Sequence, residues 1–213
     1  MKIVFFGDSI TDMNRSWQHP EHPAFTYGVG YPNFVAGELL YENPKKYEII
    51  NRGISGHRVV DLYARIKMDV WNYEPDVLSI LVGVNDVWHK LIHNNGVEIE
   101  RWERIYRMMI EDTLAQLPNI KIIICEPFIL NGKETNGEDR WEKLLEVKEY
   151  AKVAKKIATD YHLPFVSLQE QFDKMSSVYG VEPYLYDGVH PAPAGAKFIA
   201  NEWLKVFKEE VDL

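Results

Sequence analysis

A serine that could act as a nucleophile stands directly after the first apolar run of the chain. Residues 3–6 read Ile-Val-Phe-Phe and are followed by Gly7, Asp8 and Ser9. A serine hydroxyl is a poor nucleophile near neutral pH unless an imidazole is placed to take its proton. Asp8 or Ser9 could instead simply cap the next helix, which residues of these types do at many strand-to-helix turns. A nucleophilic role for Ser9 therefore requires a partner histidine elsewhere in the chain.

His190 is the histidine with a suitably placed carboxylate. Of the seven histidines, it alone has an aspartate, Asp187, in a turn that could bring the carboxylate beneath the ring. An aspartate that accepts a hydrogen bond from one ring nitrogen leaves the other nitrogen free to act as a base. The same spacing also suits a turn aspartate followed by a surface histidine. The pair is a candidate relay for Ser9.

Two further segments could supply hydrogen-bond donors to a developing oxyanion. Asn85 follows the apolar run at 77–82, and its side-chain amide could donate, although Asn85 or Asp86 could also cap a helix. Gly56 follows the run at 47–50 and could offer a backbone N–H with no side chain in the way, although a turn glycine would serve equally well. Losing one such donor costs roughly 3 to 4 kcal/mol in hydrolases.

Short apolar runs alternate with segments of helical periodicity along the chain. We expect strands at 3–6, 47–50, 77–82, 120–125 and 164–167, and helices at 31–40, 59–70, 100–117, 140–161 and 194–207. Continuous apolar strands are typical of a parallel sheet covered by helices on both faces. The sequence therefore predicts an α/β fold, a doubly wound three-layer domain over 1–213 with a five-stranded parallel sheet. Loops that follow parallel strands meet at one sheet edge, which would bring the four candidate segments together.

Two segments show no periodicity of either kind. Residues 14–30 contain prolines and several aromatic residues, and we expect a long loop near the candidate site. Residues 131–139 are polar and contain two Asn-Gly pairs, which predicts an exposed loop between the fourth strand and the fourth helix. The role of each loop stays open.

Composition narrows the possible partners and the location. The chain has 213 residues, of which 46% are hydrophobic and 26% charged, as in a globular protein. A net charge of -8 offers little attraction for phosphates, so we expect neither a nucleic-acid nor a membrane partner. The apolar run at 3–6 is shorter than the ~7 residues that a signal peptide needs, and Cys125 has no second cysteine to pair with. These features favour a cytoplasmic protein, and the 14–30 loop and the last helix could form a homo-oligomer interface.

The candidate segments resemble, in order, the four blocks of the SGNH, or GDSL, hydrolase family. These are Gly7-Asp8-Ser9, Ile54-Ser55-Gly56, Gly83-Val84-Asn85-Asp86 and Asp187-Gly188-Val189-His190-Pro191. The resemblance runs from residue 3 to the final helix and implies a flavodoxin-like αβα sandwich. It implies that Ser9 attacks an ester carbonyl, with His190 as base and then acid and Asp187 orienting the ring. It also implies an oxyanion hole formed by the backbone N–H groups of Ser9 and Gly56 and the side chain of Asn85, with no metal or organic cofactor.

Within that family, the sequence is most similar to acetyl-xylan and acetyl-xylooligosaccharide esterases at 7–12, 51–56 and 83–88. We expect aromatic side chains near the same edge to stack on sugar rings, with Asp8 as a further candidate contact; ordinary packing is the alternative for each ring. These aromatic residues are Trp17, Tyr27, Trp88 and Tyr184. The expected function is therefore an esterase that removes acetyl groups from a small carbohydrate ester. One alternative is a lysophospholipase or thioesterase of the same fold. Another is a carbohydrate-binding protein without turnover.

Two other patterns carry less weight. Asp8, which follows the first expected strand, resembles the aspartate nucleophile of haloacid-dehalogenase-like phosphatases. Those enzymes have a second aspartate two positions after the first, whereas this chain has Ile10 there. Gly28 and Gly30 look like the start of a dinucleotide fingerprint, but no expected strand directly precedes them and Asn33 stands where the third glycine belongs. We therefore expect no nucleotide site.

Overall fold

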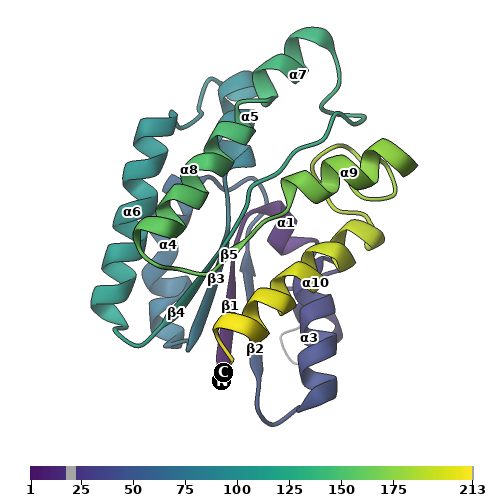
Figure 1. Ribbon diagram of the computed structural model, residues 1–213. Coiled ribbons are helices and arrows are strands. Elements are labelled where there is room, and N and C mark those ends of the chain that lie inside the picture. Colours follow the sequence, from purple (N-terminus) through teal and green to yellow (C-terminus); the bar gives the residue numbers. More distant parts are fainter. Residues whose placement is uncertain (18–22, 213) are drawn as a thin grey trace.

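The structure, a computed structural model that describes residues 1–17 and 23–212, is built around a five-stranded sheet (Figure 1). The strands are β1 (Lys2–Gly7), β2 (Glu48–Gly53), β3 (Val77–Leu81), β4 (Lys121–Cys125) and β5 (Phe165–Val166). All neighbouring strands are parallel, in the order β2-β1-β3-β4-β5. The expected five-stranded parallel sheet is confirmed, although β5 is shorter than the run at 164–167 predicts.

Helices cover both faces of this sheet. They are α1 (Ser9–Asp12), α2 (Pro23–Thr26), α3 (Tyr31–Glu42), α4 (Val59–Asp69), α5 (Val84–His93), α6 (Ile99–Gln116), α7 (Glu138–Leu144), α8 (Val147–Asp160), α9 (Gln169–Tyr179) and α10 (Pro193–Glu210), with a short 3₁₀ helix η1 (Trp71–Tyr73). In Figure 1, α3 and α10 lie together on one face, and α4, α6 and α8 cover the other. The predicted three-layer αβα architecture is confirmed.

Several helices differ from the expected boundaries. The single helix expected at 140–161 is two helices, α7 and α8, separated at Leu145 and Glu146. The helices α5 and α9 were not among the expected helices. In the 14–30 loop, α2 is a single short turn of helix, and residues 18–22 lie outside the described residues.

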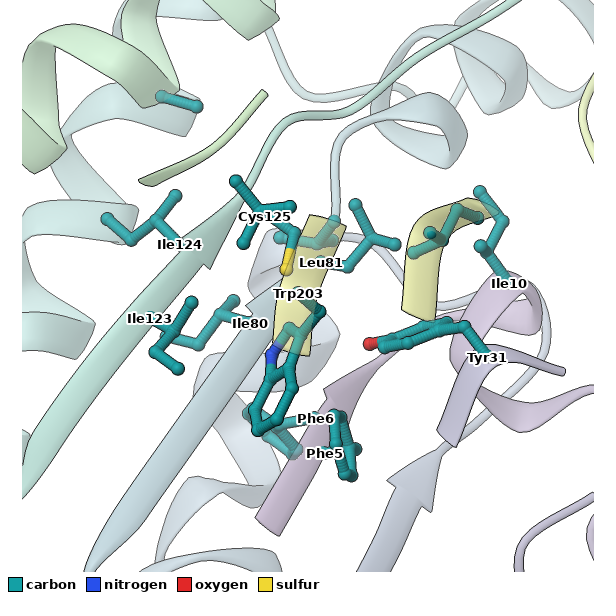
Figure 2. Close-up of a cluster of buried hydrophobic side chains, with 14 of the residues drawn as sticks. Phe5, Phe6, Ile10, Tyr31, Ile80, Leu81, Ile123, Ile124, Cys125 and Trp203 are labelled. Carbon is teal, nitrogen blue, oxygen red and sulfur yellow. The ribbon is translucent and has the colours of Figure 1, made fainter. Parts of the chain in front are cut away.

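Large side chains from distant elements meet in the core (Figure 2). The ring of Phe5 on β1 lies 5.4 Å from the ring of Tyr31 on α3 and 5.0 Å from the ring of Trp203 on α10. The indole Nε1 of Trp203 donates a hydrogen bond of 2.9 Å to the Oγ of Ser79 on β3, so these two buried polar groups are paired. These contacts fix α3 and α10 against the sheet.

The strand order sets where a site can form. The chain passes from β1 to β2 on one side and then returns to β3 on the other, so β1 lies between them. At the carboxyl edge, Gly7 of β1 pairs with Gly53 of β2 and Leu81 of β3. The loops that follow these three strands therefore begin side by side, and open α/β sheets bind their ligands at such a point. Within the described ranges, no helix combines the length and apolar character needed to cross a membrane.

Candidate active site

Ser9 is the first residue of helix α1, immediately beyond the end of β1. The carboxylate of Asp8 caps this helix, because its Oδ1 accepts a hydrogen bond of 2.9 Å from the backbone N–H of Ile10. The turn is tight: a Cβ on Gly7 would lie only 2.4 Å from the Oγ1 of Thr11. The glycine and the aspartate thus make the turn, which leaves the Ser9 hydroxyl available for another partner.

That partner is His190. Its Nε2 lies 2.8 Å from the Oγ of Ser9, and its Nδ1 lies 2.6 Å from Oδ2 of Asp187. The other carboxylate oxygen of Asp187 accepts hydrogen bonds from the backbone N–H groups of Val189 and His190, at 2.8 and 2.7 Å. Gly188 permits the turn with a φ of 102°, which other residues rarely adopt. The structure thus brings hydroxyl, imidazole and carboxylate into one hydrogen-bonded series.

The surroundings of Asp187 and His190 favour the ionised form of Asp187. Burial alone would raise the pKa of Asp187, but hydrogen bonds from the ring and the backbone N–H of His190 and from Val189 bring it below its ordinary value. Burial likewise opposes charge on His190, but the hydrogen bond and charge of Asp187 raise the pKa of His190 above its ordinary value. Asp187 therefore holds the imidazole in one orientation and stabilises its protonated form.

Asp8 is buried, whereas we expected it at the surface of the site as a substrate contact. Its side chain is 1% exposed and points into the protein as the cap of α1, so it presents no surface to a substrate. This corrects the expectation that Asp8 contacts the substrate. Burial raises the pKa of Asp8 to about 6, despite the hydrogen bond from Ile10 and the nearby charge of His190.

Two of the candidate oxyanion donors, Gly56 and Asn85, lie in the segments that follow β2 and β3. Gly56 has a φ of 81°, and no heavy atom lies within 4 Å of the place where its Cβ would be, so the space beside this peptide is open. Asn85 is in the first turn of α5, and its Nδ2 donates a hydrogen bond of 3.1 Å to the backbone carbonyl of His57. A side-chain amide has a second N–H on the same nitrogen. The N–H of Ser9 is in the first turn of α1, where the helix provides no carbonyl for it.

Trp17 and Tyr27 line a cavity to which Ser9, His190 and Asp187 do not contribute. This cavity of about 290 Å³ lies beside the edge strand β2 and is also lined by Arg15, Arg52 and Tyr73. The guanidinium of Arg15 stacks on the indole of Trp17, with its carbon 3.2 Å from the ring centroid. In the described part of the chain, none of the triad residues, Gly56 or Asn85 lines this cavity. A contact of these two aromatic residues with the substrate stays a prediction.

The other two expected aromatic contacts are partly exposed, and their contact with a substrate stays a prediction. Trp88 on α5 and Tyr184 before the Asp187 turn are both half-buried and packed against the core. A further aromatic residue beside His190, Tyr186, was not singled out from the sequence. Its ring is 50% exposed and stacks on the imidazole of His190, with centroids 5.8 Å apart and an interplanar angle of 19°. Its position directly before Asp187 is the signal that could have identified it.

The 131–139 segment is not simply an exposed loop. Its Glu134 donates a backbone hydrogen bond of 2.8 Å to the carbonyl of Asp187, and Leu130, just before it, donates one of 2.9 Å to the carbonyl of Gly188. Thr135 is fully buried beneath this turn. The predicted exposed loop therefore supports the turn that carries Asp187 and His190.

No cluster of metal ligands accompanies these groups within the described residues: no three His, Cys, Asp or Glu side chains gather as an ion would require. Cys125 lies instead in the sheet core, where burial raises the pKa of its thiol to about 12.

Comparisons with known proteins agree with this arrangement. Residues 5–198 match the GDSL-like Lipase/Acylhydrolase family. The chain is 32% identical over 210 residues to an acetylxylan esterase from Geobacillus stearothermophilus, covering 96% of this chain and 92% of that protein. A crystal structure of a catalytic mutant of an acetylxylan esterase from the same organism superposes with a TM-score of 0.84 at 30% identity, over 96% of this chain and 93% of that one.

A candidate GDSL-like lipase from Parabacteroides merdae ATCC 43184 is also similar. Its crystal structure gives a TM-score of 0.90 at 35% identity, over 97% of this chain and 95% of that chain. The matches span the whole sheet and all four sequence blocks. The chain therefore belongs to the GDSL-like lipase/acylhydrolase family and is a carboxylic ester hydrolase.

Proposed function

We propose that the chain is a serine esterase in which Ser9 forms an acyl-enzyme intermediate. The observation that carries this proposal is the continuous series from the Oγ of Ser9 to Nε2 of His190, at 2.8 Å, and from Nδ1 of His190 to Asp187, at 2.6 Å. A serine within hydrogen-bond reach of an imidazole, which a carboxylate orients in turn, has the geometry of an activated nucleophile.

The reaction has two halves. As Ser9 Oγ bonds to the ester carbonyl carbon, His190 Nε2 takes the hydroxyl proton. The tetrahedral intermediate then collapses, the bond to the alcohol breaks, and His190 returns the proton to the leaving oxygen. Water attacks the acyl-serine in the same way and releases the carboxylic acid. Asp187 keeps the proton on Nδ1 throughout and stabilises the imidazolium in each half.

The oxyanion formed in each half needs donors that are already in place. We assign this role to the backbone N–H groups of Ser9 and Gly56 and to the Nδ2 of Asn85. The open space at Gly56 and the anchored amide of Asn85 support the assignment. Donors held in a fixed orientation stabilise the transition state without the reorganisation that water would need.

The substrate we propose is an acetyl ester of a short oligosaccharide such as a xylooligosaccharide. Acetylxylan esterases from Geobacillus stearothermophilus are among the relatives, with 32% identity over nearly the full length, and this supports the assignment. The exposed ring of Tyr186 beside His190 offers a flat apolar face on which a sugar could stack.

Acetate release from acetylated xylooligosaccharides tests this proposal directly. The wild-type protein should release acetate, and Ser9→Ala should not. In a parallel series of nitrophenyl esters, kcat/KM should fall as the acyl chain lengthens from acetate to octanoate. A steady rise along that series would instead support a lysophospholipase or thioesterase. Sugar binding without hydrolysis of any ester would support a carbohydrate-binding protein.

A further inference from the structure

Arg65, on helix α4, is a buried cation directly behind the proposed oxyanion hole. Its side chain is 8% exposed. Its guanidinium donates four hydrogen bonds: to the Gly7 carbonyl at 3.0 Å, the Arg52 carbonyl at 2.8 Å, Oδ2 of Asp69 at 2.6 Å and Nδ1 of His57 at 3.0 Å. The guanidinium also packs over the ring of Phe6 on β1, with its carbon 4.4 Å from the ring centroid. One side chain thus contacts several segments that surround the site.

Two of these bonds join the ends of the strands that lead into the site. Gly7 is the last residue of β1, shortly before Ser9, and Arg52 lies near the end of β2, shortly before Gly56. The Gly7 carbonyl also accepts a hydrogen bond of 3.0 Å from the backbone N–H of Ile54. Arg65 therefore fixes the relative position of the two loops whose N–H groups would meet the oxyanion.

The hydrogen bond from Arg65 to His57 connects Arg65 indirectly to Asn85. Since the Arg65 guanidinium donates to Nδ1 of His57, that nitrogen carries no proton, and the neutral ring holds its proton on Nε2. Burial and then the charge of Arg65 lower the pKa of His57, which agrees with a neutral ring. The backbone carbonyl of the same residue accepts the hydrogen bond from Asn85. Holding the His57 ring thus also holds the peptide that orients the Asn85 amide.

We infer that Arg65 is a positioning residue of the oxyanion hole, which acts through His57 on Asn85 and through the Gly7 carbonyl on the Ser9 turn. The inference rests on the proposed function. Only a planar guanidinium can direct donors toward a ring nitrogen, two carbonyls and a carboxylate at once, whereas an ammonium group is a compact point charge. Asp69, fully buried, neutralises Arg65 and also pairs with Arg52.

The first test replaces the Arg65 guanidinium but keeps its positive charge. In Arg65→Lys, kcat for nitrophenyl acetate should fall about 10- to 100-fold while KM stays within about threefold, because a displaced donor weakens the transition state more than the ground state. Binding of a small boronic acid, whose tetrahedral serine adduct needs the same donors, should weaken in parallel with kcat. Lys67→Gln, on the exposed side of the same helix, is the control and should match the wild type.

The second test leaves Arg65 in place and changes its acceptor. In His57→Leu the acceptor is lost, and kcat should fall about tenfold. In His57→Asn the amide oxygen can take the place of Nδ1, so most of that activity should return. Because the part of the effect that passes through Asn85 is already lost in Asn85→Ala, adding Arg65→Lys should slow Asn85→Ala by a smaller factor than it slows the wild type.

The outcomes separate this inference from the function on which it rests. A folded Arg65→Lys protein with wild-type kcat and boronic-acid affinity would overturn the positioning role and leave the esterase intact. Equal losses in His57→Leu and His57→Asn would do the same, even if Arg65→Lys failed to fold. If the wild type bound the boronic acid but hydrolysed no ester, the proposed function would be rejected, while boronic-acid binding would still test the role of Arg65.

Discussion

The Nε2 of His190 lies 2.8 Å from the Oγ of Ser9, although the two residues are 181 positions apart in the chain. Ser9 follows the first strand, and His190 precedes the last helix, α10. The two meet because α10 packs on the sheet with Trp203 against Phe5 of β1. The contact therefore depends on the packing of the whole fold.

Ser9→Ala should abolish ester hydrolysis and leave the fold intact. The change removes only the hydroxyl, and the Asp8 carboxylate still caps α1. We expect kcat to fall by at least about 10³-fold, with an unchanged circular dichroism spectrum and Tm. Hydrolysis of nitrophenyl acetate and labelling by a serine-directed fluorophosphonate provide the measurements. Retention of most of the activity in a folded Ser9→Ala protein would remove Ser9 from the mechanism.

Activity should fall as the pH is lowered through the pKa of His190. Protonated His190 cannot take the Ser9 proton, so kcat/KM should rise with pH and then level off. Burial works against the charged ring, but Asp187 raises the pKa of His190 above 6.5, so the midpoint should lie on the alkaline side of an ordinary histidine. A pH–rate profile from about pH 5 to pH 9 measures it. A flat profile over this range would contradict the role of His190 as the base.

Replacing the carboxylate isolates its contribution to that midpoint. In Asp187→Asn the ring loses its negative partner, so the midpoint should move to lower pH and kcat should drop by up to about 10⁴-fold. The exposed Asp139→Asn, on α7, is a matched control and should keep the wild-type profile. An unchanged midpoint in Asp187→Asn would mean that another group sets the pKa of His190.

The sequence was sufficient to predict the sheet and the four segments at its edge. Buried strands such as β3 and β4 are continuous apolar runs, and local chemistry marks the turns at Ser9 and Asp187. Periodicity could not separate α7 from α8, because no glycine or proline stands at Leu145 or Glu146 where the helices part. Such a break depends on packing between distant elements.

Long-range contacts around the site were also beyond the sequence. The polar 131–139 segment looks solvated, but Thr135 is buried because the segment folds back on the Asp187 turn. Likewise, the spacing of Arg65 on α4 suggests only a helical position, whereas its bond to the Gly7 carbonyl joins residues 58 positions apart. Contacts of this kind depend on where loops cross in space, which periodicity does not encode.

Asn85→Ala should lower kcat much more than it raises KM. Its amide is held by the His57 carbonyl at 3.1 Å and is proposed to donate to the oxyanion only as charge develops. We expect a loss of about 10²- to 10³-fold in kcat for acetate esters. Asn95→Ala, an exposed asparagine after α5, is the matched control and should retain wild-type kinetics. A variant affected only in KM would show that Asn85 binds substrate and does not serve the transition state.

Thr135 tests whether the loop beneath the triad turn matters for activity. Its Oγ1 donates to the Leu130 carbonyl at 2.5 Å and accepts from the Gly132 N–H at 2.7 Å. Thr135→Val keeps the shape but leaves both buried groups unpaired, which should lower the free energy of unfolding by roughly 1 to 3 kcal/mol. Because the loop supports the Asp187 backbone, kcat should also fall, by about tenfold.

Thr135→Ser separates the hydroxyl from the methyl group. It keeps both hydrogen bonds and removes one buried methyl, so its stability should fall by about 1 kcal/mol while kcat stays near that of the wild type. Chemical denaturation and steady-state kinetics on the two variants make the comparison. If Thr135→Val lost stability but kept full kcat, the loop would support the fold without positioning Asp187. If both variants lost kcat equally, the methyl contact would hold the turn as much as the hydroxyl does.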